Sequence, residues 1–457
     1  MNSRDTICAL ATAPGGALGI IRVSGPDAFS IVSALCSVCC DSVAANTVHF
    51  TRLVERDAIQ SHQQIIDEVL VSVFRAPHSY TGEDSVEISC HGSPYILNKV
   101  LELLIQHGCR MANPGEFTQR AFLTGKMDLS QAEAVADLIA SSNKATHQIA
   151  MSQLRGDFSS ELSRLRDKLL KLTSLLELEL DFSDHEDLEF ADRSELLALA
   201  KEINTRVTHL AKSFETGQAL KQGIPVAIVG KTNVGKSTLL NRLLHEDRAI
   251  VSDIHGTTRD TIEDTIEIQG VTFRFIDTAG IRQTTDAIEQ IGIERTYAAI
   301  EKARIVIWMI EEKPGHEEID RLLQLTKGKE TIVVCNKSDK IDFNTFIPPI
   351  VPLLCISAKT GHNIDKLESK LFEAAKIPEL NDNNIIVTSA RQYGALVRAQ
   401  DNLSRVLEGM ETDLSGDLIA EDLRLVLSDL AEITGDKGII QSQEVLNNIF
   451  SHFCVGK

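Results

Sequence analysis

The sequence predicts a multidomain α/β protein with a small α+β N-terminal domain, a discontinuous all-α domain, and an α/β domain inserted into the all-α domain. Three observations predict this. The chain has 457 residues, enough for two to four domains. Prolines recur up to Pro114, are absent until Pro225 and are absent again after Pro378. Both proline-free stretches carry apolar residues at three- and four-residue steps, which favours helices.

The N-terminal domain is expected to span residues 1–118. Its apolar runs alternate with polar residues at strand period in some places and follow helical spacing in others. The expected strands cover residues 20–23, 68–74 and 86–90, and the expected helices cover 28–35 and 95–107.

The all-α domain is expected to combine residues 119–220 with residues 381–457. Its predicted helices cover residues 129–140, 154–180, 395–407 and 418–433. Insertion of another domain between the two parts is physically easy, because the ends of a compact domain lie at its surface and often close together. The acidic stretch 177–195 is interpreted as a solvated helix edge or connection without a function.

The inserted domain is expected to span residues 221–380. Short apolar strands alternate there with polar loops and a helix, as in a doubly wound parallel sheet, which binds ligands at the carboxyl ends of its strands. The predicted strands cover residues 224–229, 271–276, 303–310, 331–335 and 352–356, and a helix covers 237–244.

A phosphate-binding loop follows the first of these strands. Residues 230–237 spell G-x-x-x-x-G-K-S, whose backbone N–H groups cradle phosphates while Lys236 and Ser237 address the β/γ-phosphates and Mg²⁺. The residues expected to bind nucleotide here are Asn233, Val234, Gly235, Lys236, Ser237 and Thr238.

A second loop selects the base. In Asn336-Lys337-Ser338-Asp339, the Asp339 carboxylate can accept hydrogen bonds from the N1–H and the 2-amino group of guanine. Adenine offers no such pair of donors. Ser357-Ala358-Lys359 follows the next strand and is suited to the guanine O6 edge. The sequence therefore predicts a GTPase with a Ras-like P-loop domain.

The regions in switch positions have an unusual composition. Asp277-Thr278-Ala279-Gly280 offers a carboxylate for Mg²⁺ and an N–H for the γ-phosphate, and Thr258 is the natural Mg²⁺ ligand of the first switch. The next residue is Ile281, which cannot orient water as the glutamine of Ras-type proteins does. No arginine finger can be assigned. Hydrolysis therefore needs another positive charge and another group that positions water. The switch residues expected to contact GTP are Ser252, Asp253, Ile254, His255, Gly256, Thr257 and Thr258.

The motifs together resemble the MnmE (TrmE) family of tRNA modification GTPases, over essentially the whole chain. The residues that carry the resemblance are Asn233 and the stretches 256–260, 277–282, 291–295, 115–122, 129–134 and 453–457. Two features depart from the family pattern: Thr232 stands where proline is frequent, and the stretch 436–448 is longer than expected, which bears on the route to the C-terminus.

The resemblance implies a K⁺ ion in place of an arginine finger, held by Asn233, Ser252, Ile254 and Thr257. It also implies that Glu289 orients the attacking water through a second water, although from sequence alone a solvated glutamate is the plainer interpretation. The catalytic residues would then be Lys236, Glu289 and, for the tRNA chemistry, Cys454, which could equally be a small buried thiol.

A second site is implied for a one-carbon tetrahydrofolate, 5-formyl- or 5,10-methylene-tetrahydrofolate, at Arg22, Glu87, Lys126 and Lys457. A carboxylate suits the adjacent N–H donors of a pterin, and cations suit the glutamate tail. Taken singly, these residues would be ordinary surface charges. The resemblance further implies a homodimer and a heterotetramer with the FAD-dependent MnmG, adding a carboxymethylaminomethyl-type group to C5 of the wobble uridine (position 34) of certain tRNAs.

Composition limits the other possibilities. The net charge of −19 disfavours tight nucleic-acid binding by this chain alone. No apolar run is long enough for a membrane span, no signal peptide is recognisable, and nine cysteines without a pairing pattern fit a cytoplasmic protein. The main alternative is a regulatory GTPase of ribosome assembly with a KH-type loop at residues 435–438, although that region is acidic and helical.

Overall fold

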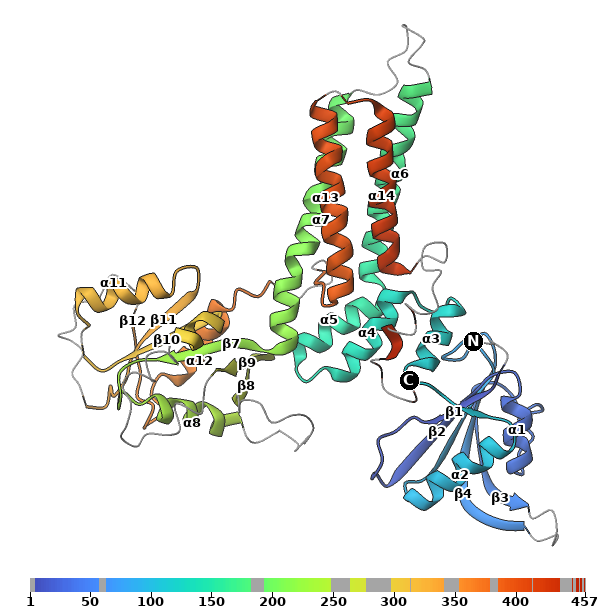
Figure 1. Ribbon diagram of the computed structural model, residues 1–457. Helices are drawn as coiled ribbons and strands as arrows, with labels where there is room; N and C mark the ends of the chain where they lie inside the picture. The colour runs from blue at the N-terminus through green and yellow to red at the C-terminus, as the bar shows by residue number, and fades with distance from the viewer. Residues whose placement is uncertain are drawn as a thin grey trace. The chain divides into compact units, whose positions relative to one another are not determined.

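The computed structural model describes residues 5–56, 63–181, 193–247, 264–276, 297–312, 314–340, 353–378, 385–412, 414–435, 446, 449–451, 453 and 456. The chain divides into two compact units. Unit 1 comprises Met1–Ile139, Gln153–Asn204 and Ala395–Lys457, and unit 2 comprises Ala140–Ser152 and Thr205–Gly394. The mixed α/β class is confirmed, and the three predicted domain boundaries remain predictions (Figure 1).

A six-stranded sheet forms the N-terminal part of unit 1, in the order β3-β4-β5-β2-β1-β6. All neighbouring strands are antiparallel except β1 and β6. Its strands are β1 (Ile7–Leu10), β2 (Leu18–Ser24), β3 (Thr47–Arg56), β4 (Gln63–Phe74), β5 (Ser85–His91) and β6 (Arg110–Met111). Helices α1 (Ala28–Leu35) and α2 (Pro94–Gln106) contribute to the apolar core on one face of the sheet. The predicted strands and helices are confirmed, whereas β1, β3 and β6 were not predicted.

The alternation of side chains in β4 shows why this sheet has one covered face. Val69, Val71 and Val73 are buried, while Leu70 between them is 46% exposed. Successive residues of a strand point to opposite faces, so the valines enter the core beneath the two helices. The other face carries polar side chains together with a few exposed apolar ones.

The helices predicted at residues 129–140, 154–180, 395–407 and 418–433 are confirmed; the first has the predicted bounds, and the ends of the other three are shifted. Besides α1 and α2, the helices that lie wholly or partly in unit 1 are α3 (Glu116–Leu123), α4 (Leu129–Ala140), α5 (Lys144–Arg155), α6 (Asp157–Asp181), α7 (Arg193–Gln222), α13 (Ala390–Glu411) and α14 (Gly416–Thr434). Helix α14 packs against α6 (Figure 1). The boundaries between the units fall inside α4, α5, α7 and α13.

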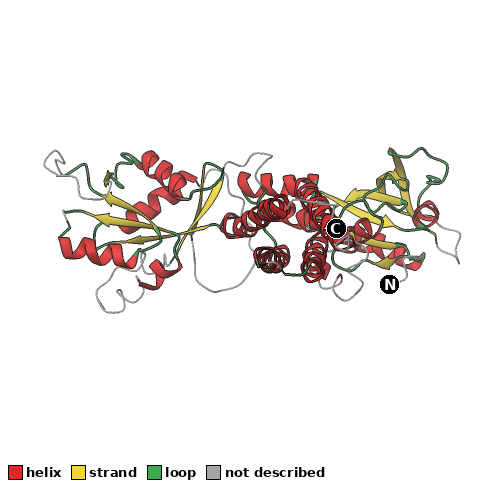
Figure 2. Ribbon diagram, turned by 90° about the horizontal axis from the view of Figure 1, so that it is seen from above, coloured by secondary structure: helices red, strands yellow, loops and turns green. Residues whose placement is uncertain are grey.

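Unit 2 contains a six-stranded sheet in the order β12-β11-β10-β7-β9-β8, parallel except for the β8–β9 hairpin. Its strands are β7 (Ile224–Val229), β8 (Asp264–Ile268), β9 (Val271–Phe275), β10 (Ile305–Ile310), β11 (Glu330–Cys335) and β12 (Leu353–Cys355). Helices α8 (Lys236–Asp247), α11 (His316–Leu325) and α12 (Ile364–Ala374) lie on its two faces (Figure 2). The five predicted strands and the helix after the phosphate loop are confirmed.

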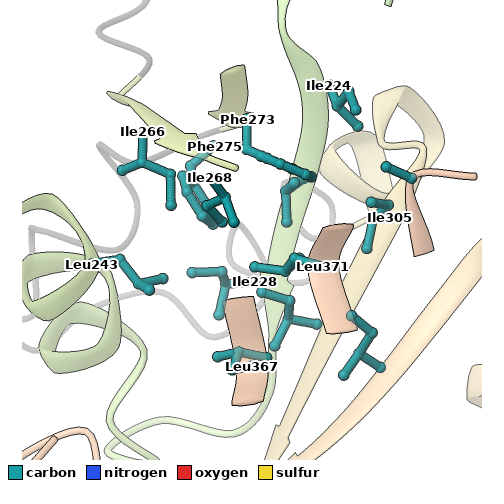
Figure 3. Packing of buried hydrophobic residues seen from close by; sticks show 14 of the residues in the cluster. Ile224, Ile228, Leu243, Ile266, Ile268, Phe273, Phe275, Ile305, Leu367 and Leu371 are labelled. Carbon is teal, nitrogen blue, oxygen red and sulfur yellow. The ribbon is translucent and has the colours of Figure 1, made fainter. Parts of the chain in front are cut away.

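The core of unit 2 draws on residues from outside the predicted inserted domain. Its larger apolar cluster contains the strand residues shown in Figure 3, together with Leu243, Leu367 and Leu371 from the helices. Ala145, Ile149, Leu220 and Ile386 are members of the same cluster.

The turn of the β8–β9 hairpin lies against the start of α5. The Ala145 N–H donates to Gly270 O over 3.0 Å, and Asn143 Nδ2 donates to Thr272 Oγ1 over 2.8 Å. Gly270 has a positive φ of 81°, and a Cβ there would lie 2.9 Å from the Cβ of Lys144. The close approach therefore requires glycine.

A buried ionic network joins the N-terminal sheet to α3. Glu116 is 2% exposed and accepts hydrogen bonds from Arg110 (2.6 and 3.0 Å), Arg120 (3.1 Å) and the Asn113 N–H (2.8 Å). Arg120 also donates to Asp5 over 2.8 Å. Burial alone would raise the pKa of Glu116, but hydrogen bonds from Arg110, Asn113 and Arg120 outweigh burial and lower it.

The variant Glu116→Ala is expected to destabilise unit 1, because it leaves two arginines partly buried without their shared carboxylate. We expect a loss of about 3–5 kcal/mol in opening free energy, measured by native-state hydrogen exchange of the β1 amides. The native pKa is lowered, so Glu116 stabilises the fold above its ordinary pKa of 4.5, and this contribution is lost as the pH falls through the native value. The control is Glu68→Ala, which breaks the exposed Arg52–Glu68 pair and should cost about 1 kcal/mol or less. Equal effects of the two variants would contradict the prediction.

Candidate functional site

The phosphate loop connects β7 to α8 through backbone conformations that favour glycine. Gly230 and Gly235 have φ of 151° and 102°. A Cβ on Gly235 would lie 2.2 Å from Asn336 Nδ2, and one on Gly230 would lie 2.3 Å from Met309 O. The loop can therefore pass this close to neighbouring strand ends only without side chains at these two positions.

Lys236 stands at the start of α8, and its ammonium group bridges carbonyls of its own loop. Its Nζ donates to Gly230 O over 2.7 Å and to Lys231 O over 2.8 Å. Burial lowers the pKa of Lys236 below its ordinary value. Ser237 and Thr238 follow in the first turn of the helix, where the N–H groups and the helix dipole favour an anion. The arrangement concentrates positive potential within the loop.

Asn336 holds two loops together at the carboxyl edge of the sheet. It is 3% exposed, its Nδ2 donates to Val234 O over 2.8 Å, and its Oδ1 accepts the Ala358 N–H over 3.0 Å. The structure thus brings together the phosphate loop and both loops that the sequence assigns to the base.

The carboxylate of Asp339 is fixed by one of these loops. Ser357 Oγ donates to Asp339 Oδ1 over 2.7 Å, and this hydrogen bond is the main cause that lowers the pKa of Asp339. The side chain is exposed and remains ionised at neutral pH. Lys337, which has a positive φ of 64°, pairs with Glu311 over 2.6 Å. An oriented acceptor therefore faces solvent where two base N–H donors could bind.

Several predicted site residues lie outside the described residues. They are Ser252, Asp253, Ile254, His255, Gly256, Thr257, Thr258, Asp277, Thr278, Ala279, Gly280, Glu289, Cys454 and Lys457. Their roles remain predictions.

A second polar cluster lies on the N-terminal sheet of unit 1. Arg22 on β2 and Glu87 on β5 are cross-strand partners, and Arg22 Nε and Nη2 approach Glu87 Oε1 at 2.9 and 2.8 Å. The guanidinium also lies 5.1 Å from the ring centroid of Tyr80 and 5.6 Å from that of Phe117. Glu87 Oε2 accepts no hydrogen bond from any described residue.

The C-terminal tail reaches this cluster, whereas Lys126 does not contact it. Arg22 Nη1 donates to Gly456 O over 3.5 Å, and a Cβ on Gly456 would lie 2.2 Å from Leu10 O. Lys126 Nζ donates to Pro77 O over 3.0 Å. Among the predicted folate-binding residues that the structure describes, Arg22 and Glu87 pair directly, and Lys457 lies outside the described residues.

Sequence reasoning missed three contributors to these sites. Tyr80 and Phe117 flank Arg22, and Arg242 on α8 donates to the carbonyls of Ala358 and Lys359. Tyr80 lies in a loop rich in Ser, Thr and Gly, which is a weak signal of function. Nothing in the sequence indicates a function for Arg242, because charged residues are common on the exposed face of an amphipathic helix.

Comparisons with known proteins show the family of this chain. Residues 6–126 match the family profile described as GTP-binding protein TrmE N-terminus, and residues 129–454 match that of the MnmE helical domain. The chain belongs to the MnmE family of tRNA modification GTPases. A tRNA modification GTPase MnmE from Phocaeicola vulgatus is 54% identical over 100% of both chains, and one from Bacteroides fragilis is 53% identical over 100% of both. The corresponding protein of Christiangramia forsetii is 48% identical, again over 100% of both.

Membership of the MnmE family confirms the resemblance seen in the sequence and identifies the chain as a GTPase that takes part in tRNA modification. It favours this function over the ribosome-assembly alternative. Among the helices that the structure describes, none is long and apolar enough to cross a bilayer. The described side chains also include no group of three or more His, Cys, Asp or Glu residues that could hold a metal ion.

Exchanging Asp339 for asparagine is expected to change base selection. The variant loses the anionic acceptor for two guanine donors, so GDP binding should weaken by about a hundredfold or more. Xanthine carries a carbonyl where guanine carries its 2-amino group, and the newly introduced side-chain amide can donate to it. Xanthosine diphosphate should therefore bind the variant more tightly than it binds the native protein, as measured by displacement of a fluorescent nucleotide. Asp320→Asn on α11 is the control and should leave both affinities unchanged. A variant that loses GDP without gaining xanthosine diphosphate would contradict this role.

Proposed function

We propose that this protein is a K⁺-dependent GTP hydrolase that acts with the FAD-dependent partner MnmG. Together they would add a carboxymethylaminomethyl-type group to C5 of the wobble uridine (position 34) of certain tRNAs, using a one-carbon tetrahydrofolate, in the cytoplasm. The observation that carries the proposal is the Arg22–Glu87 pair, flanked by two aromatic rings, on a sheet separate from the guanine site. Guanine nucleotide binding alone gives no reason for such a pair.

The phosphate loop fits a monovalent cation at one position. Asn233 adopts a positive φ of 64°, its side chain is exposed, and no described residue forms a hydrogen bond with its amide. The amide oxygen is therefore available as a ligand. The other proposed K⁺ ligands are Ser252, Ile254 and Thr257. A bound K⁺ would supply the positive charge that other GTPases take from an arginine.

Mg²⁺ would be held by Ser237 at the start of α8 and by Thr258. Lys236 would exchange its loop carbonyls for phosphate oxygens, and Glu289 would orient the attacking water. GTP hydrolysis would then drive a conformational cycle rather than activate the uridine directly.

The second site fits a pterin. Glu87 uses Oε1 for Arg22 and keeps Oε2 available to accept adjacent N–H donors. The partly exposed ring of Tyr80 lies beside the Arg22 guanidinium, and the fully buried ring of Phe117 lies against the same guanidinium. Lys126 and Lys457 would attract the glutamate tail, and Cys454 would serve the tRNA chemistry.

The N-terminal sheet also supports a homodimer. Phe50 on β3 is 67% exposed and lies opposite Leu70 on β4, and Val48 is 60% exposed. Apolar side chains grouped on an open sheet face favour contact with another protein surface. The dimer would join MnmG in a heterotetramer, and MnmG would supply most of the tRNA contact, since this chain carries a net charge of −19.

Potassium dependence can be tested by steady-state GTP hydrolysis in K⁺ and in Na⁺ at equal ionic strength. The turnover rate should be higher in K⁺ by about a hundredfold, the usual effect of removing one charge stabiliser. Asn233→Ala should abolish the difference between the two salts. Equal rates in the two salts would refute the role of potassium.

Folate binding can be tested by titrating Glu87→Ala with 5-formyl-tetrahydrofolate. We expect the affinity to fall by about tenfold or more, because a charged acceptor of the pterin is lost. Glu68→Ala removes an equivalent Arg–Glu cross-strand pair from the same sheet and serves as the matched control. GTP hydrolysis should be the same in both variants. Undiminished folate affinity in Glu87→Ala would reject the site.

A further inference from the structure

The loop of residues 357–361 is held by a side chain from the helix that follows the phosphate loop. Arg242 on α8 donates from Nε to Ala358 O over 3.3 Å and from Nη2 to Lys359 O over 2.5 Å. One planar guanidinium thus holds two successive carbonyls of a loop outside any helix or strand. A planar guanidinium with two fixed donors sets the direction of both carbonyls.

Two of the three central N–H groups of this loop donate to side-chain oxygens, and the third has no acceptor in the part of the chain that the structure describes. The Ala358 N–H donates to Asn336 Oδ1 over 3.0 Å, and the Thr360 N–H donates to Ser357 Oγ over 3.3 Å. The Lys359 N–H has no acceptor among the described residues. It belongs to the same peptide group as Ala358 O, and in a trans peptide the N–H and C=O point in opposite directions. Because Arg242 draws Ala358 O towards α8, the Lys359 N–H points away from α8.

We propose that Arg242 is a positioning residue for guanine recognition: it orients the Ala358–Lys359 peptide so that the Lys359 N–H donates to O6 of the base. The same helix carries Lys236 and Ser237 at its start, and Arg242 lies six residues further on, about 9 Å along the axis. A single rigid element therefore positions groups for both ends of the nucleotide. The inference rests on the proposed base-binding role of this loop and not on potassium, folate or MnmG.

The affinities for three nucleotides distinguish a role of Arg242 in guanine recognition from a general effect of Arg242 on the fold. GDP and inosine diphosphate both carry O6, whereas 2-aminopurine riboside diphosphate lacks O6 and keeps the 2-amino group that Asp339 would bind. Arg242→Met keeps the aliphatic stem but removes both hydrogen bonds. Its affinity for GDP and inosine diphosphate should fall by about five- to tenfold, the value of one hydrogen bond, and its affinity for the 2-aminopurine nucleotide should stay unchanged.

Two further variants complete the experiment. Arg242→Lys can donate to one carbonyl only, so its GDP affinity should lie between those of Arg242→Met and the native protein. Arg304→Met is the matched control, because Arg304 also holds a loop carbonyl, that of Ala375, over 3.1 Å. It should leave all three affinities unchanged. The fluorescence of Trp308, the single tryptophan, reports whether unit 2 stays folded.

Either of two outcomes would overturn the proposal. An equal loss of affinity for all three nucleotides in a folded Arg242→Met variant would show a general structural role. Unchanged affinity for GDP would show that the guanidinium does not position the loop. Neither outcome depends on hydrolysis, so failure of the potassium proposal would leave the test intact.

Discussion

The nucleotide site depends on the buried amide of Asn336. One side of this amide donates to the phosphate loop at Val234 O, and the other accepts the Ala358 N–H. A buried amide that lost either partner would leave a backbone polar group unsatisfied, which is costly in a close-packed interior. The location of the Asn336 amide also explains why residue 235 is a glycine, since any side chain at residue 235 would occupy the space of this amide. Phosphate and base recognition are therefore joined by one residue.

The sequence was most informative where chemistry imposes a short local pattern. The phosphate loop, the Asn336–Asp339 loop and the apolar strands of unit 2 could be predicted, because spacing and periodicity are local properties. Helix α3 could not be predicted, because Thr118, Gln119 and Arg120 are polar but buried, so hydrophobic spacing gives no signal. Helix α7 was missed because its pattern begins within the acidic stretch that was interpreted as a connection.

The sequence alone does not predict contacts between residues that lie far apart along the chain. Arg22 and Glu87 are 65 positions apart, and only the pairing of β2 with β5 brings them together. Arg242 and Lys359 are 117 positions apart. No periodicity encodes such pairs. The family resemblance indicated Arg22 and Glu87 as binding residues, but it did not indicate the rings of Tyr80 and Phe117 beside them or the role of Arg242.

The β8–β9 hairpin and its neighbours bear on how the nucleotide-binding part can be studied in isolation. Ala145, Ile149, Leu220 and Ile386 complete the same apolar cluster as the central strands, and all four lie beyond residues 221–380. Trimming the chain to that range would remove these four members of the cluster and the partners of the hairpin turn. Such a fragment would expose apolar surface and tend to self-associate. Kinetic constants measured on it would therefore describe an altered molecule.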